Sequence, residues 1–262
     1  MVNEIKNIMN GISPLWGICS FDSIEEALIP CRAKNRIPQN ASSVIVACFP
    51  YLLDEEKYSG SNVSKYAVVE DYHNVALSRL NKACLELKEK FPSEAFEPFA
   101  DNSPVPEVRA ACLAGLGKRG MNSLLITEKY GSYVFIGEIV TSLKIEAAEF
   151  IIEECIRCGK CVNACPAKAI DQNGIFREKC LSEITQKKGE LTAEETELMK
   201  KCGCVWGCDI CQDICPMNKN AATTEIEEFI LSAVPIFEKG APLENRAYEW
   251  RGRKVIERNL NL

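Results

Sequence analysis

The chain has 262 residues, with 31 basic and 37 acidic side chains and a formal net charge of −6. Its 47% of apolar and 26% of charged residues are typical of a globular protein and exclude collagenous, low-complexity and disordered classes. No segment holds the roughly 18 uncharged apolar residues that a membrane span needs, so we expect no membrane association. Residues 1–11 lack the basic-then-apolar layout of a secretion signal, and we therefore expect a cytoplasmic protein.

The first 150 residues have the pattern of an α/β domain. A short β-rich apolar run predicts a buried strand at residues 44–49. Apolar side chains at helical spacing predict a helix over residues 71–90, with Asp71 as its N-cap. A second helix is predicted from Pro106 to residue 113, and an aromatic, β-branched run predicts a strand at residues 132–140.

Cysteine is the outlier of the composition, with 15 residues, of which ten fall between Cys155 and Cys215. Because a cytosolic protein is kept reduced, we interpret this block as metal ligands rather than as disulfides. The other five cysteines have apolar neighbours, which is typical of ordinary buried thiols.

The first cysteine run, Cys155, Cys158, Cys161 and Cys165 followed by Pro166, has the spacing C-x2-C-x2-C-x3-C-P. Three thiolates at this spacing surround one [4Fe–4S] cube, and in two-cluster ferredoxins the fourth binds the other cube. The alternative is a structural zinc site, but zinc sites use two separated pairs more often than a tight run of four.

The second run, Cys208, Cys211 and Cys215 before Pro216, lacks one cysteine, because Val205 stands where the pattern requires the remaining thiol. The eighth ligand must then come from Cys180, Cys202 or Cys204. With the two cysteines before proline exchanged, the first cube has Cys155, Cys158, Cys161 and Cys215. The second has Cys165, Cys208, Cys211 and one of the three candidates. Two cubes form a low-potential electron relay, and the separate α/β domain should hold whatever receives the electrons.

Three further features of the sequence are candidates for a chemical role. Residues 115–120 match GxGxxG but follow a predicted helix rather than a strand, so we interpret them as a turn and not as a dinucleotide site. His73 is the only histidine and is interpreted as structural. Asp101 follows an apolar strand, so it is either a turn cap or a buried acid with a raised pKa that donates a proton.

Taken together, these segments resemble the epoxyqueuosine reductase family over nearly the whole chain. The resemblance is carried by residues 71–73, 99–104, 114–117, 122, 130–133, 137–138, both CP runs, 180–189, 207–209 and 250–259. It implies an α+β fold with three parts. These are a corrinoid-binding α/β domain related to that of reductive dehalogenases (1–150), a bacterial two-cluster ferredoxin-like domain (151–220) and a C-terminal helical tail (221–262).

The resemblance also implies an activity, cofactors and site residues. The activity is reduction of epoxyqueuosine to queuosine at the tRNA wobble position, with electrons passing through two [4Fe–4S] clusters to cobalamin. Asp101 corresponds to the proton donor, and Cys180 to the eighth cluster ligand. The positions that correspond to corrinoid contacts are Arg32, Asp101, Asn122, Leu125, Ser182 and Asp209.

The expected partners are tRNA and an electron donor such as ferredoxin or flavodoxin, and we expect a monomer. Two departures weaken the tRNA assignment: Met121 replaces a frequent lysine, and longer family members continue into helical repeats that grip tRNA. The alternatives are a corrinoid reductase acting on a small molecule and an iron–sulfur protein that reduces a partner's corrinoid.

Overall fold

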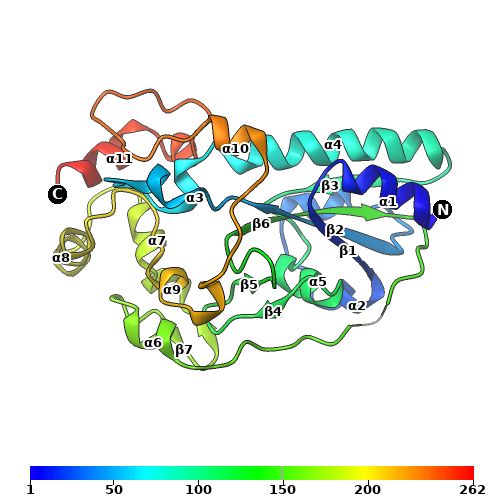
Figure 1. The fold of residues 1–262 in the computed structure, drawn as a ribbon, viewed down its shortest axis with the longest axis horizontal. Helices are drawn as coiled ribbons and strands as arrows, with labels where there is room; N and C mark the ends of the chain where they lie inside the picture. The colour runs from blue at the N-terminus through cyan, green and yellow to red at the C-terminus, as the bar shows by residue number, and fades with distance from the viewer. Residues whose placement is uncertain (149) are drawn as a thin grey trace.

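The computed structural model describes residues 1–148 and 150–262. Its main sheet has four antiparallel strands in the order β1-β2-β6-β3 (Figure 1). The strands are β1 (Leu15–Ser20), β2 (Ser43–Pro50), β3 (Phe96–Phe99) and β6 (Val134–Thr141). The predicted strands at 44–49 and 132–140 are confirmed as β2 and β6. The interpretation of the first part as a mixed helix and sheet domain therefore holds.

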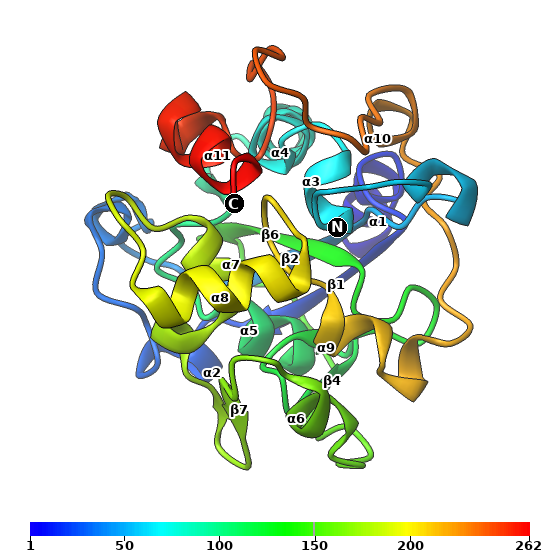
Figure 2. The ribbon, with the colours of Figure 1, turned by 90° about the vertical axis from the view of Figure 1, so that its left-hand side faces the viewer.

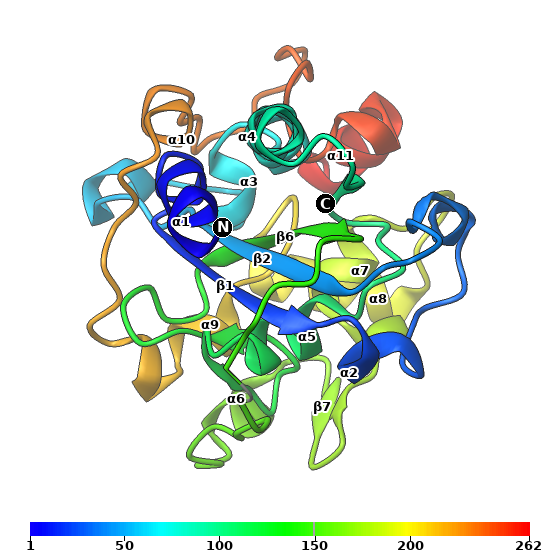
Figure 3. The ribbon, with the colours of Figure 1, turned by 90° about the vertical axis from the view of Figure 1, so that its right-hand side faces the viewer.

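Helices cover both faces of this sheet, with α1 and α4 on one side and α2 and α5 on the other (Figure 3). They are α1 (Val2–Asn10), α2 (Asp22–Glu25), α4 (Tyr72–Lys90) and α5 (Glu107–Leu113). Strand β2 is buried along its whole length because its alternate side chains enter the two apolar cores. This explains why its sequence is a continuous apolar run rather than an alternating one.

The predicted helix at 71–90 is confirmed as α4, and its start is set by Asp71. The Asp71 carboxylate accepts a hydrogen bond from the His73 backbone N–H at 3.0 Å, which satisfies one of the free donors at the helix N-terminus. The predicted turn lies between α5 and β4 (Lys118–Arg119), so the strand occupies part of residues 115–120, and Gly115 in the turn is in the left-handed region at φ 75°.

The segment that holds the ten clustered cysteines, residues 155–215, is called here the cysteine-rich half. It is built from short helices and a small hairpin on one side of the sheet (Figure 2). It contains α6 (Lys160–Ala164), β7 (Ile170–Asp171), β8 (Gly174–Ile175), α7 (Leu181–Thr185), α8 (Ala193–Cys202) and α9 (Ile210–Asp213). The remaining elements are α3 (Lys65–Val68), β5 (Leu125–Ile126), α10 (Glu227–Leu231) and α11 (Arg253–Leu260).

The C-terminal segment packs back onto the first half of the chain. Phe229, Phe237 and Ile256 are buried in the same apolar core as Ile45 and Phe49 of β2. The beginning and the end of the chain therefore share one apolar core. The division at residues 150 and 220 stays a prediction. Among the described residues, no helix combines the length and apolar character needed to cross a bilayer.

Candidate functional site

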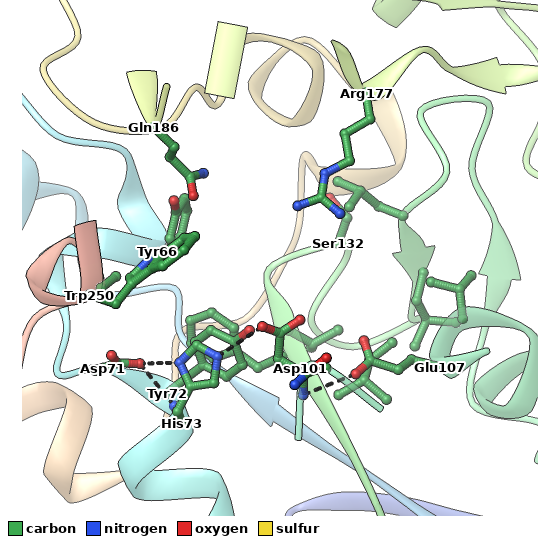
Figure 4. A pocket seen from close by; sticks show the side chains of 18 residues that line it. Tyr66, Asp71, Tyr72, His73, Asp101, Glu107, Ser132, Arg177, Gln186 and Trp250 are labelled. Carbon is green, nitrogen blue, oxygen red and sulfur yellow. Dashed lines mark hydrogen bonds and ion pairs between the residues drawn. The ribbon is translucent and has the colours of Figure 1, made fainter. Parts of the chain in front are cut away.

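A cavity of about 850 Å³ lies between the main sheet and the cysteine-rich half. Its walls come from both parts of the chain (Figure 4): Tyr72, His73, Asp101, Leu125 and Phe135 from the first, and Arg177, Gln186 and Trp250 from the second. A volume of this size suits a cofactor or a large substrate group. A second cavity of about 580 Å³ adjoins it and shares Asp101, Glu107 and Arg177.

Three polar side chains form a chain of hydrogen bonds along one wall of the main cavity. His73 Nδ1 lies 2.6 Å from Asp71 Oδ1, and His73 Nε2 lies 3.1 Å from Asp101 Oδ2. Asp101 lies in the loop that follows strand β3, and the backbone of this loop turns sharply. Asp101 and Asn102 have φ angles of 52° and 39°, in the left-handed region that few non-glycine residues adopt.

The hydrogen bonds place the proton of this group on the histidine. Burial lowers the pKa of His73, but the hydrogen bonds to Asp101 and Asp71 outweigh it and raise the pKa to about 9. The same bond to His73 lowers the pKa of Asp101. The sequence alternative of an Asp101 with a raised pKa is therefore wrong, because its imidazole partner stabilises the carboxylate.

Sequence reasoning missed His73 as a site residue, since a single histidine on a helix carries no functional signal. The interpretation of His73 as purely structural does not fit its position on the cavity wall. Its place two residues after the N-cap Asp71 is the only local feature that could have pointed to it. Arg177 and Trp250 were also missed, because only the fold brings them to the cavity.

The cysteines of the two runs lie in two neighbouring groups. Burial raises the pKa of Cys161, and the nearby thiolates of Cys155 and Cys215 raise it further. Burial also raises the pKa of Cys211 to about 12, with additional contributions from the thiolates of Cys180, Cys161 and Cys165. The side chains that influence one another thus include Cys215 beside the first run and Cys165 beside the second.

Of the three candidates for the eighth ligand, Cys180 interacts electrostatically with the largest number of thiols of the second group, although Cys202 also interacts with Cys165. Cys180 influences both Cys208 and Cys211 electrostatically and is itself influenced by Cys165. The Cys204 thiol instead donates a hydrogen bond to the Trp206 carbonyl oxygen, with a sulfur–oxygen distance of 3.1 Å.

No three histidine, cysteine or acidic side chains in the described part of the chain converge on a point that a single metal ion would fill. A tetrahedral zinc site requires such convergence, with zinc–sulfur distances of about 2.3 Å.

The structure disperses the residues that correspond to corrinoid contacts. Leu125 lines the main cavity, as does Asp101. The Asn122 side-chain amide lies 3.7 Å from the Cys211 sulfur, and Asp209 lines a smaller cavity beside Cys208. Arg32 lines none of these cavities. Ser182 lies next to Tyr66, which does line the main cavity.

Several buried polar atoms near Tyr66 have no hydrogen-bond partner in the described residues. They are Ser64 Oγ, Trp206 Nε1 and Asp209 Oδ1. Buried polar groups are normally satisfied, so such atoms indicate a missing ligand or water. Ser64 and Asp209 line the smaller cavity beside Cys208, and Tyr66 links this region to the main cavity. The corrin ring carries amide groups that both donate and accept hydrogen bonds, so the chemistry of these donors and acceptors fits a corrinoid.

Comparison with known proteins supports the same assignment. Residues 154–218 match the 4Fe-4S double cluster binding domain family, and residues 32–102 match the family described as Epoxyqueuosine reductase QueG, DUF1730. The epoxyqueuosine reductase of Synechocystis sp. is 35% identical over 72% of this chain and 68% of its own length. That of Listeria monocytogenes is 34% identical over 90% of this chain and 66% of its own length.

Solved structures agree at the level of the fold. Epoxyqueuosine reductase from Streptococcus thermophilus superposes with a TM-score of 0.82 at 22% identity, covering 99% of this chain and 79% of that one. An epoxyqueuosine reductase solved with a modified tRNA stem loop gives the same TM-score at 24% identity, covering 98% and 78% of the two chains.

The chain is shorter than most of these relatives. It spans 62% of the Lactococcus garvieae relative and 45% of the Aliivibrio fischeri relative. The cofactors of the family are two [4Fe–4S] clusters and cobalamin, and the residues described above fit both. The sequence identity to curated members, together with both family matches, shows that the chain belongs to the epoxyqueuosine reductase family.

Proposed function

We propose that this protein reduces epoxyqueuosine to queuosine at the wobble position of tRNA. The observation that supports this most directly is the hydrogen-bonded chain Asp71–His73–Asp101 on the wall of a large cavity. Removal of an epoxide oxygen as water needs a proton source beside the oxygen and two electrons. The cavity wall offers the proton source, and the cysteine-rich half next to it offers a route for the electrons.

In this proposal Asp101 delivers the proton and His73 holds it. At neutral pH the raised pKa of His73, about 9, keeps the imidazole protonated, while Asp101 is a carboxylate. Asp101 is the more exposed of the two and can pass this proton to an oxygen in the cavity. Asp71 orients the imidazole through Nδ1, as a carboxylate does in other proton-transfer sites.

Cobalamin, when bound, would supply a nucleophilic, two-electron-reduced metal for carbon–oxygen bond cleavage. We propose that the residues around Tyr66, together with Leu125, hold it, because of their unpartnered polar atoms and their proximity to the cavity. Asn122, Ser182 and Asp209 belong to the same proposal. The exposed position of Arg32, at the start of a short 3-10 helix (Arg32–Arg36), gives its role in the site less support.

We assign Cys155, Cys158, Cys161 and Cys215 to the first cluster and Cys165, Cys180, Cys208 and Cys211 to the second. The grouping of the thiols described above supports this exchange. Cys158 is exposed, whereas Cys165 is buried, so electrons from a small carrier such as ferredoxin or flavodoxin would enter at the first cluster.

The loop at residues 185–189 and the C-terminal helix α11 support tRNA binding. Arg258 of α11 donates hydrogen bonds to the carbonyl oxygens of Lys187 and Gly189, which fixes this basic loop. Trp250, with 57% of its surface exposed, lies at the same cavity as Gln186 and offers a face for base stacking. We further propose that the protein acts as a monomer in the cytoplasm.

The test is anaerobic reconstitution with iron, sulfide and hydroxocobalamin, followed by reaction with an epoxyqueuosine-containing stem loop. We expect about eight irons and one cobalt per chain, and formation of queuosine under a low-potential reductant. Clusters without retained cobalt would contradict the proposal and favour an electron-transfer protein. Turnover of a free epoxide without binding of the stem loop would favour a small-molecule reductase.

A further inference from the structure

Two glutamates lie on the far side of Asp101 from His73. Glu107 begins α5 and lines both adjoining cavities. Its Oε1 accepts a hydrogen bond from the Asp101 backbone N–H at 3.1 Å, and Figure 4 shows it across Asp101 from the imidazole. Glu138 lies on the central strand β6, fully buried between Val46 of β2 and Phe99 of β3.

Among the described residues, the Ser103 hydroxyl is the one group near Glu138 that favours a negative charge. Within the described residues, neither of its carboxyl oxygens meets hydrogen-bond geometry, although the Ser103 hydroxyl lies nearby. An unpaired carboxylate in such a site costs several kcal/mol, and a buried carboxyl group therefore keeps its proton.

Charge repulsion extends this argument to Glu107. Burial raises the pKa of Glu138 well above its ordinary range, and the carboxylates of Glu107 and Asp101 raise it further. Burial likewise raises the pKa of Glu107 to about 7, with Asp101 adding to the effect and His73 opposing it. One fully buried and one half-buried carboxyl group beside a third carboxylate do not all ionise.

In the described part of the chain, no cation forms an ion pair with either glutamate. The other titratable or charged groups that face the pair are Cys19 of β1, Cys48 of β2, Cys112 of α5, Tyr72 and His73 of α4, Asp101, and Cys31, Arg109, Arg119 and Arg177 around the adjoining cavity. None of the three arginines donates a hydrogen bond to either glutamate in the described part of the chain. Arg109 bonds the Ser23 carbonyl oxygen, and Arg177 bonds Glu183.

The proposed reaction needs more protons than Asp101 and His73 hold. Both carbon–oxygen bonds of the epoxide break, the carbons receive two electrons and become an alkene, and the oxygen leaves as water with two protons. The electrons arrive through the clusters, and the His73–Asp101 pair stores one proton.

We propose that Glu107, backed by the buried Glu138, stores the second proton and returns it to Asp101 after the first has been used. This inference rests on the proposed function. Glu107 acts through Asp101, to whose backbone N–H it is hydrogen-bonded. Glu138 keeps its own proton and therefore supplies no charge that would compensate a carboxylate at Glu107.

The first test is infrared spectroscopy of the reconstituted holoenzyme, prepared with carboxyl-labelled glutamate, between pH 5 and pH 9. We expect a carbonyl stretch from neutral glutamate that persists at neutral pH. Glu107→Gln should remove the part that titrates with a midpoint near pH 7, and Glu138→Gln the part that does not titrate. A spectrum without neutral glutamate at pH 6, or bands unchanged by both substitutions, would overturn the proposal.

The second test is the pH profile of stem-loop reduction. Glu107→Gln should lower kcat about 100-fold, leave KM unchanged and remove the alkaline limb near pH 7. Glu128→Gln, at an exposed position, is the matched control and should behave as wild type. A lower kcat with the limb retained would make Glu107 merely structural and refute the proposal.

The two tests separate this inference from the proposed function. The infrared signal needs no substrate, so it reports the stored proton even if epoxyqueuosine is not reduced. A wild-type enzyme that shows the neutral glutamates but does not turn over the stem loop would refute the proposed function, and with it the role of the second proton. If Glu138→Gln does not fold, Glu107→Gln at the cavity wall still decides the outcome.

Discussion

His73 Nε2 lies 3.1 Å from Asp101 Oδ2, although the two residues are 28 positions apart in the chain. The N-terminus of α4 supplies the imidazole and the end of β3 supplies the carboxylate, so the contact exists only when helix and sheet pack. As a consequence, the pKa of the His73 imidazole is raised and the pKa of the Asp101 carboxyl group is lowered.

Removal of the Asp101 carboxylate should abolish proton delivery without unfolding the chain. We expect Asp101→Asn to lower turnover by about 100-fold to 10,000-fold, the range found for loss of a general acid. Cluster and cobalt content should stay at wild-type levels, because 59% of the Asp101 side-chain surface is exposed. The control is Asp54→Asn, at an exposed position outside the cavity. Wild-type turnover in Asp101→Asn would contradict the role of Asp101.

The stability of the protein should depend on pH through His73. Its pKa is about 9 in the folded state, against about 6.5 in an unfolded chain. A raised folded-state pKa contributes stability that is fully present below about pH 6.5 and is lost as the pH rises through about 9. Urea unfolding of wild type and His73→Gln over this range should show free energies of unfolding that converge at high pH. Parallel curves would indicate that His73 has no charged partner in solution.

The eighth cluster ligand is decided by comparing cysteine variants. We expect Cys180→Ser to lose the second cluster, leaving about four of about eight irons per chain. Cys202→Ser and Cys204→Ser serve as matched controls, and each should keep the full iron content. Iron analysis and low-temperature electron paramagnetic resonance would measure both clusters. A full iron content in Cys180→Ser, together with loss of iron in Cys202→Ser, would reverse the assignment.

Binding of an anticodon stem loop should depend on the basic loop at residues 185–189. Lys188 is exposed there, and we expect Lys188→Ala to weaken binding uniformly and to reduce the salt slope by about one. Lys90→Ala removes the same charge at the C-terminal end of α4, which is the end farther from His73 and the cavity (Figure 1). This variant should leave the affinity unchanged. Fluorescence anisotropy at several salt concentrations provides the measurement. Equal slopes for both variants would place the nucleic acid elsewhere.

The C-terminal helix should contribute measurably to stability through Asn259. Its buried side-chain amide donates hydrogen bonds to the carbonyl oxygens of Thr185 at 2.7 Å and Val205 at 2.8 Å. Asn259→Ala leaves both carbonyl groups without these donors, so we expect a loss of about 1–3 kcal/mol in the free energy of unfolding. Asn261→Ala, at an exposed neighbouring position, should change it by less than about 0.5 kcal/mol. A loss of similar size in both variants would show that the C-terminal end of α11, which Asn261 caps, rather than the two buried hydrogen bonds, is responsible.

The sequence by itself determined the features that depend on neighbouring residues. The spacing of Cys155 to Cys165 predicts a cluster because its ligands follow one another along the chain. The Asp71 cap and the apolar run of β2 are local in the same sense, and both are confirmed. The motifs spread along the chain also sufficed for the family resemblance, which the comparisons confirm.

Only the tertiary structure decided which distant groups meet. In the folded chain, His73 contacts Asp101 and Glu138 interacts with Glu107. Cys180 interacts with Cys208, although their separation in the sequence does not predict this. The tertiary structure also contradicted the raised pKa that was one of the two interpretations of Asp101. The physical reason is that spacing along a helix or turn is fixed by covalent geometry, whereas contacts between elements depend on strand register and packing. A pKa then follows from those contacts and from the burial that they create.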